Sequence, residues 1–167
     1  SSIVLGQSSR MGTASSTQLL VAPSARYLAG GGAAASAVGL DATFWNPAGL
    51  AQSENAIDAI FSNRQYIAGI DNNFFGVSTD LGALGRVGLT ARTFNIGNIK
   101  ETTVYAPDGT GEEFTPSFSI IGASVSKILS DNTSVGINAN LVRESFGRVA
   151  ASGLAFDLGV QYRGLFL

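Results

Sequence analysis

The sequence predicts an all-β fold, an antiparallel up-and-down sheet that crosses a membrane as part of a β-barrel. Three observations lead to this prediction. The chain of 167 residues is 45% hydrophobic but only 13% charged, whereas a soluble domain is roughly 25% charged. Its mean hydropathy is +0.24, yet it contains no run of about 18 apolar residues, the length that a transmembrane helix needs. Its hydrophobic residues instead alternate with small and polar ones, as in membrane-spanning strands.

Alternation with a period of two identifies the strands. Six segments show it: Ile57–Ile67, Phe74–Leu81, Arg86–Phe94, Ser117–Leu129, Thr133–Ser145 and Gly153–Arg163. In the clearest of them, one face carries Leu154, Phe156, Leu158, Val160 and Tyr162. The alternation changes near Phe94 and Ile96, which predicts a β-bulge there. Lys100–Tyr105 is a candidate seventh strand.

The connections alternate in length along the chain. Gly82–Gly85 and Ser130–Asn132 have the composition of tight turns, whereas Ala68–Asn73, Gly97–Pro116 and Phe146–Ser152 are predicted to be longer. In an up-and-down sheet, this places short turns on one rim and long loops on the other. Outer-membrane barrels have this asymmetry.

The charged and aromatic residues of the apolar face fit a membrane boundary. Lys127 and Arg143 fall on this face near connections, where their long side chains can reach the interface. Phe75 and Tyr162 are predicted at strand ends, where barrels carry an aromatic girdle. The alternative is a soluble sandwich or lipocalin-like barrel. Its polar face would be rich in Lys and Glu, whereas the polar face here is mostly Gly, Ser, Asn and Thr.

The composition excludes several kinds of chemistry. The chain has no Cys and no His, so disulfides, Cys/His zinc sites and a catalytic His are absent. A net charge of −2 argues against nucleic-acid binding. Gly30–Gly32 lacks the Gly-Lys-Ser/Thr that completes a phosphate loop, and the acidic stretches Asp71–Asn73 and Asp108–Glu113 indicate turns more strongly than a calcium site. We expect no enzymatic activity, no cofactor and no resident metal.

Four charged residues are expected to face the interior of the barrel: Asp80, Arg92, Asp157 and Arg163. They either line a path for solutes or form ion pairs with one another. Pairing is the stronger expectation, because buried charges need partners.

The first part of the chain has a different character. Residues 1–50 are rich in Ser, Ala and Gly and carry almost no charge, and two motifs stand in them, Ser24–Ala33 (SARYLAGGGA) and Asp41–Ala51 (DATFWNPAGLA). These motifs resemble the N-terminal signature of the PorV/PorQ family of FadL-like outer-membrane proteins, with departures at Ser24, Ala29 and Gly30. The residues that carry the motif are Arg26, Gly31, Gly32, Asp41, Trp45, Asn46, Pro47 and Gly49. Turn chemistry alone explains Asn46, Pro47 and Gly49.

The resemblance extends to four later segments: Ala68–Asn73, Gly109–Phe114, Ser134–Asn138 and Ser152–Gly159. It implies a barrel of fourteen strands, with residues 1–54 as an internal hatch or plug and residues 55–167 as its first strands. Six strands cannot close around a hatch, so the chain is expected to represent the N-terminal half of such a barrel, unless several chains complete it.

The resemblance also implies a location and a role. The location is the bacterial outer membrane, in contact with its lipid or lipopolysaccharide. The role is transport across that membrane or type IX secretion, with hydrophobic small molecules or secretion-translocon proteins as partners. The alternative is a structural protein that anchors or binds partner proteins.

Overall fold

The structure, a computed structural model, describes residues 21–23, 25–29, 33–65, 69–100, 111, 113–146 and 149–164. Within these residues, none of the helices has the length and hydrophobicity of a transmembrane helix.

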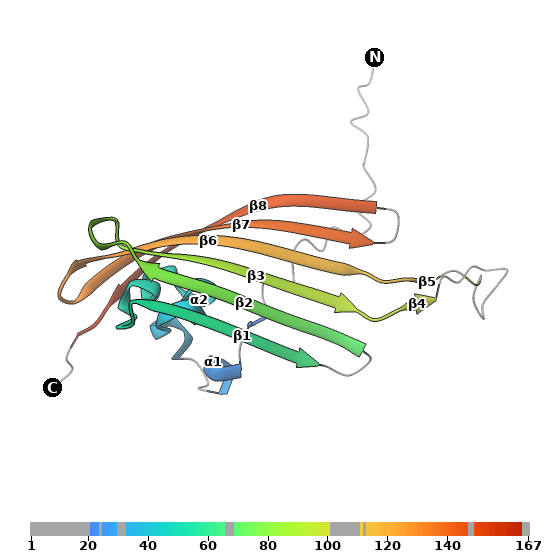
Figure 1. The fold of residues 1–167 in the computed structure, drawn as a ribbon, viewed down its shortest axis with the longest axis horizontal. Coiled ribbons are helices and arrows are strands. Elements are labelled where there is room, and N and C mark those ends of the chain that lie inside the picture. Colours follow the sequence, from blue (N-terminus) through green and yellow to red (C-terminus); the bar gives the residue numbers. More distant parts are fainter. Residues whose placement is uncertain are drawn as a thin grey trace, which may run out of the picture.

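The six predicted strands are present in one antiparallel sheet (Figure 1). They are β1 (Ile57–Gln65), β2 (Ile70–Asp80), β3 (Arg86–Ile96), β6 (Ser117–Ser130), β7 (Thr133–Phe146) and β8 (Val149–Tyr162). The order β1-β2-β3-β6-β7-β8 makes every strand a neighbour of the preceding one, which confirms the all-β, up-and-down prediction. In the described residues, β1 and β8 each pair with a single neighbour, so the sheet is open.

The two ends of the sheet carry different connections. Residues 81–85 and 131–132 join strands at one end, which we call the short-turn rim. At the opposite rim, the connections from Gln65 to Ile70 and from Phe146 to Val149 are also short, and the difference between the two rims is the one long connection, from Ile96 to Ser117. This connection contains the two-stranded sheet of β4 (Ile99–Lys100) and β5 (Glu113–Phe114). The rest of the candidate seventh strand, beyond Lys100, lies outside the described residues.

Two of the three predicted long connections are wrong, because the strands are longer than their apolar pattern. β2 already begins at Ile70, where Asp71 pairs with Gln65 of β1. β7 continues to Phe146, which pairs with Val149 of β8. Polar residues at these strand ends have a loop-like composition, although the backbone ladder runs through them. Phe75, predicted at a strand end, therefore lies in the middle of β2.

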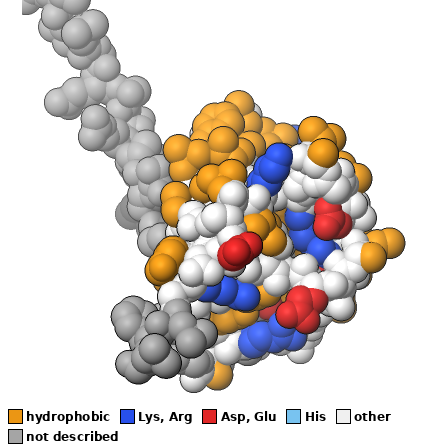
Figure 2. Space-filling view, turned by 90° about the vertical axis from the view of Figure 1, so that its left-hand side faces the viewer, with side chains coloured by type: hydrophobic (Ala, Val, Ile, Leu, Met, Phe, Trp, Pro, Cys, Tyr) orange, Lys and Arg blue, Asp and Glu red, His pale blue; other side chains and the backbone are white. Residues whose placement is uncertain are grey.

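The two faces of the sheet have an inverted distribution of side chains. On the face that we call outer, large hydrophobic side chains are exposed, up to 80% for Leu158. On the opposite, inner face, small and polar side chains are buried, including Ser78, Ser124, Ser126, Ser134, Asn138 and Asn140. Viewed from the short-turn rim, charged side chains gather toward the middle and hydrophobic ones toward the margin (Figure 2).

The predicted bulge near Phe94 is absent. β2 and β3 pair without a shift from Ile70↔Ile96 to Asp80↔Arg86. The alternation changes because the inner face itself becomes apolar toward the opposite rim, where four hydrophobic side chains are buried: Phe74, Phe94, Ile120 and Val142. We call these four residues the inner apolar cluster. The one register shift along the described ladders of the large sheet lies between β6 and β7, at Ile128 and Ser130.

Short helices of residues 21–53, the N-terminal segment, lie against the inner face (Figure 1). They are α1 (Ala25–Ala29), η2 (Ala33–Ser36), η3 (Gly39–Asp41), α2 (Ala42–Trp45) and η4 (Pro47–Gln52). η4 contacts β6, β7 and β8, and η3 contacts β1 and β2. The segment thus reaches both halves of the sheet on its inner side.

Two glycines of the sheet form the seat of η4. A Cβ atom at Gly136 would overlap the backbone of Pro47, and one at Gly159 would overlap the Asn46 side chain. Only a strand without side chains at these positions lets the η4 backbone approach so closely.

We predict that Gly159→Ala lowers the free energy of unfolding by roughly 1–3 kcal/mol, the usual cost of overpacking. The matched control is Gly153→Ala on the same strand, because no atom lies within 4 Å of the added Cβ there. A urea titration of the detergent-solubilised protein, followed by the fluorescence of its single Trp, measures both. Equal stability of the two variants would contradict the proposed seat.

Candidate functional site

The site is built around the turn that links α2 to η4. Asn46 has an extended backbone (φ −156°, ψ 102°) and caps η4, since its Oδ1 accepts a hydrogen bond from Ala48 N at 3.2 Å. Pro47 follows as the first residue of the helix, where its missing N–H costs nothing. Asn46 Nδ2 also donates to Val160 O at 3.0 Å. The backbone N–H of Asn46 therefore ends α2 by donating to Ala42 O at 2.8 Å, while its side chain begins η4 and fastens the turn to β8.

Gly49 is required by close packing inside the segment. A Cβ atom at this position would overlap the carbonyl oxygen of Ala37 and lie 2.8 Å from Gln161 Oε1. The backbone of η4 therefore packs between η3 and β8 with no room for a side chain.

Serines of the inner face hold the other side of η4. Ser126 Oγ donates to Ala48 O at 2.9 Å and accepts from Ala51 N at 3.2 Å. Gln52 Nε2 donates to Ser134 Oγ at 3.0 Å. Alternation with a period of two assigns Ser126 and Ser134 to the polar face but predicts no role for them. The clue in the sequence was a small hydroxyl side chain on the inner face, which can form a hydrogen bond with a closely packed backbone.

Next to this turn is a cavity of about 410 Å³ between α2 and the sheet. Its lining includes Phe44, Trp45, Arg92 and Asp157. The Arg92 guanidinium carbon lies 5.1 Å from the centroid of the Phe44 ring, a cation–π contact. Phe44 and Trp45 meet edge to face with their centroids 4.7 Å apart. The cavity thus combines an aromatic wall with opposite charges.

Asp157 is held by amides. Its Oδ2 accepts from Asn138 Nδ2 at 3.1 Å and from Asn140 Nδ2 at 2.9 Å. Asn138 is itself fixed, since it donates to Thr43 O at 3.2 Å and accepts from Ser124 Oγ at 2.9 Å. These bonds give the carboxylate a fixed position beside the cavity.

Two buried donors at the cavity have no hydrogen-bond acceptor in the described residues: Trp45 Nε1 and Arg92 Nη1. Arg92 is only 6% exposed. Buried donors of this kind normally find a partner, which marks this corner as a place where a further polar group would be stabilised.

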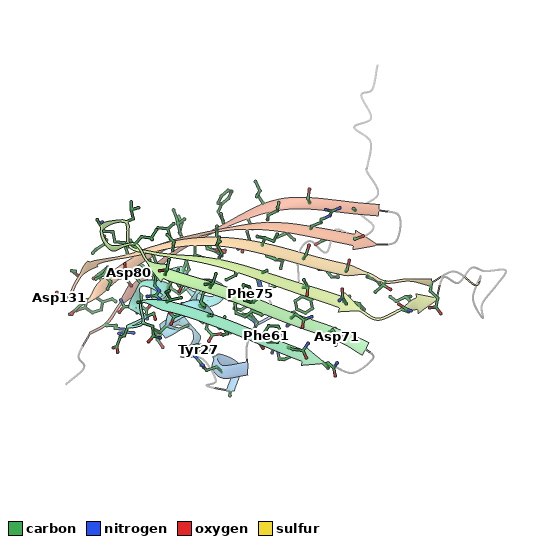
Figure 3. All side chains as sticks on the ribbon, in the orientation of Figure 1. Tyr27, Phe61, Asp71, Phe75, Asp80 and Asp131 are labelled. Atoms are coloured by element: carbon green, nitrogen blue, oxygen red, sulfur yellow. The ribbon has the colours of Figure 1, made fainter. Side chains whose placement is uncertain are left out.

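The structure brings together two of the four predicted interior charges. Arg92 and Asp157 line the same cavity. Asp80 lies at the short-turn rim (Figure 3), where its Oδ1 accepts from Gly82 N at 2.7 Å. Arg163 follows β8 and lines a second cavity, of about 530 Å³. Within the described part of the chain, no two of the four lie within 4.0 Å of each other as an ion pair, but Arg92 and Asp157 attract each other electrostatically, so the expected mutual pairing stays a prediction.

The motif residues lie mostly in one region. Arg26 Nη1 is 3.5 Å from Asp41 Oδ2, and Asp41 is buried. Trp45, Asn46, Pro47 and Gly49 form the turn described above. Gly31 and Gly32 lie outside the described residues, as do Asp108 and Glu112 of the predicted acidic loop.

The alternation pattern did not predict the ion pair between Arg86 and Asp58. The nitrogen Arg86 Nη2 lies 2.8 Å from Asp58 Oδ2, and Arg86 is buried. Arg86 also donates to Ser78 Oγ at 3.0 Å and to Asn55 O at 2.5 Å. Asp58 accepts further bonds from Ser53 Oγ at 2.5 Å and Asn55 Nδ2 at 2.7 Å. The sequence did contain a clue to this pair, because Asp58 and Arg86 both lie on the inner face near the short-turn rim.

These groups are suited to binding and positioning. Among the described residues, no group of three or more acidic side chains is arranged to hold a metal ion. Asp71, part of the alternative calcium site, pairs with Gln65 at the far end of β2 from Asp80 (Figure 3). The available chemistry is therefore hydrogen bonding, ion pairing and ring packing.

Comparison with known proteins adds no family. The sequence matches no protein-family model, and no curated protein matches it at a significant level.

We predict that Asp58→Asn lowers the free energy of unfolding by roughly 3 kcal/mol, because it leaves the buried Arg86 guanidinium without its counter-ion. Asp131→Asn, in the exposed turn between β6 and β7, is the control and should change stability by less than about 0.5 kcal/mol. Urea titrations of both variants make the comparison. If Asp58→Asn left the free energy of unfolding unchanged, the buried Arg86 guanidinium would not depend on the Asp58 carboxylate for stability.

Proposed function

We propose that this protein is an outer-membrane β-barrel protein of the PorV/PorQ type, whose sheet contacts lipid with its outer face and carries the N-terminal segment inside as a hatch. One observation carries the proposal: the outer face has an apolar band with a sharp polar edge. A soluble monomer rarely exposes a contiguous apolar surface of more than a few hundred Å². Lipid is the solvent that favours such a face.

The edge of the band is a row of cross-strand partners. From β1 to β8, the residues opposite one another on the outer face are Asn63, Asn73, Thr93, Ser119, Arg143 and Ser152. We call them the polar row. The next row toward the short-turn rim is entirely apolar: Phe61, Phe75, Ala91, Ile121, Leu141 and Leu154. A membrane–water interface favours such an arrangement, in which the outer side chains change from apolar to polar at the same level in all six strands.

The height of the band fits a bilayer. On β8 it runs from Leu154 to Tyr162, a length of about 27 Å at roughly 3.4 Å per residue. A strand tilt of about 40° reduces this to roughly 20 Å, close to the roughly 25 Å of known barrels. Lys127 and Arg143, the two cations predicted on this face, are both exposed. Arg143 belongs to the polar row itself.

Closure is required by the same argument. The edges of β1 and β8 carry unpaired backbone groups in the described sheet, and lipid does not tolerate them. Further strands, fourteen in all by the PorV/PorQ resemblance, would satisfy these edges. Such a barrel is wide enough to enclose the N-terminal segment.

Transport or a role in type IX secretion is the function that we favour within this class. The inner apolar cluster supports it, because Phe74 and Ile120 are direct cross-strand partners of Arg92. This gives the inner face an amphipathic lining beside the aromatic cavity. A scaffold role is the second candidate, supported by the β4–β5 ribbon, which projects beyond the sheet at the opposite rim (Figure 1).

We predict that a thiol in the apolar band is shielded from water by the bilayer. The chain has no Cys, and any Cys elsewhere in the full-length protein is replaced by Ser, so that each introduced Cys is the only one. In the full-length protein in bilayers, Leu89→Cys should react with a membrane-impermeant maleimide at least an order of magnitude more slowly than Thr93→Cys, because the reactive thiolate needs water. Both positions lie on the outer face of β3.

The two thiols should react alike after solubilisation in denaturant, which controls for intrinsic reactivity. Equal labelling of both in bilayers would overturn the membrane placement of the sheet.

We predict that liposomes containing the full-length protein take up a hydrophobic fluorescent solute faster than empty liposomes. The scaffold alternative predicts no such uptake. Liposomes with the thermally unfolded protein control for leakage, and the absence of protein-dependent uptake would leave transport of small hydrophobic molecules without support.

A further inference from the structure

The outer face carries a groove of about 500 Å³ near the short-turn rim. Its walls are apolar side chains of β6, β7, β8 and the turn between β2 and β3: Leu84, Val125, Val135, Ile137, Leu158 and Val160. The turn 81–85 stands out from the sheet on the side opposite the helices (Figure 1). Leu84 therefore overhangs a shallow channel on the surface that we propose contacts lipid.

One charged residue, Lys127, lines this groove. Its Nζ donates one hydrogen bond, to Ala83 O at 2.8 Å, while an ammonium group has three N–H donors. No Asp or Glu oxygen of the described residues lies within 4.0 Å of it. Asp80 and Asp131 lie at the same end of the sheet (Figure 3) but form no ion pair with it. The lining of the groove thus includes a cation with unused donors.

We propose that this groove binds an anionic glycerophospholipid, with an acyl chain along the apolar walls and the phosphate at Lys127. This inference rests on the proposed membrane location. The positive charge of Lys127 is complementary to the negative charge of the lipid phosphate. One Lys near a membrane surface raises the affinity for anionic lipid about fivefold. The bond to Ala83 O holds the ammonium beside the turn 81–85 at the short-turn rim, where a phosphate would lie.

The position of the groove selects a phospholipid over lipopolysaccharide. Short turns of outer-membrane barrels face the periplasm, and the leaflet on that side consists of phospholipids. The long connection, with β4 and β5, lies at the opposite rim.

Arg143 provides the matched comparison. Among the described residues it is a second exposed cation on the outer face, but it belongs to the polar row and does not line the groove. A non-specific attraction of anionic lipid to any surface cation would act at both residues, whereas a built groove acts at Lys127 alone.

Quenching of a Trp by brominated lipid tests the proposal in the full-length protein. Leu158→Trp places the probe in the groove, and Leu154→Trp places it on the same face of β8 outside the groove. Bilayers hold equal amounts of phosphatidylglycerol and phosphatidylcholine, with either one brominated. The ratio of quenching gives the local preference for the anionic lipid, after the fluorescence of the parent protein, which includes Trp45 on the inner side, is subtracted.

We expect a preference of about fivefold for phosphatidylglycerol at Leu158→Trp and little at Leu154→Trp. Lys127→Gln should abolish the preference, Lys127→Arg should keep it, and Arg143→Gln should leave it unchanged. Equal quenching by both lipids at Leu158→Trp, or an equal loss in Arg143→Gln, would overturn the site while leaving the membrane location intact. No quenching at either Trp would overturn the membrane location, and the site with it.

Discussion

The register of the six strands is the constraint on which the rest of this structure depends. Side chains of a strand alternate between faces, so a slip of one residue would exchange the outer and inner sets completely. Continuous antiparallel pairing from β1 to β8 aligns residues of the same kind into rows. The polar row, the apolar rows and the buried serines of the inner face are each products of that alignment. The two faces can therefore meet different surroundings although the backbone is one continuous ladder.

Small residues on the inner face allow the backbone of the N-terminal segment to pack very close to the sheet. Gly136 and Gly159 remove side chains where η4 lies, and Ser126 provides a short hydroxyl that bonds to its backbone. Larger residues would hold the N-terminal segment away from the sheet and leave the Asn46 side chain short of β8. Packing and hydrogen bonding here are consequences of the same small residues. The polar inner face is thus a docking surface for the chain's own first segment.

The sequence predicted the strands, which depend on local alternation. It did not predict contacts between residues that are far apart in the sequence. Period-two patterns identified all six strands of the large sheet, because apolar outer positions alternate with small or polar inner positions along each of them. Strand residues such as Asp71 of β2 and Ser152 of β8 were predicted to lie in loops, because a polar residue near the end of a strand does not mark the end of backbone pairing. The alternation changes near Phe94 because the inner face becomes apolar there. The residues of the outer face alone do not predict that change. Arg92 and Asp157 were found by parity, but the amides that hold Asp157 and the Arg86–Asp58 pair required the register between strands.

The hydrogen bond from Asn46 to Val160 O also has a consequence for the order of folding. These residues are 114 positions apart in the sequence, whereas each strand pairs with the one just before it. Hairpins with neighbouring partners close quickly, because short loops lose little entropy. The bond to β8 cannot form until the last of these six strands has joined. The earliest part of the chain is therefore among the last to reach its final contacts, and a chaperone that acts before that moment would meet it undocked.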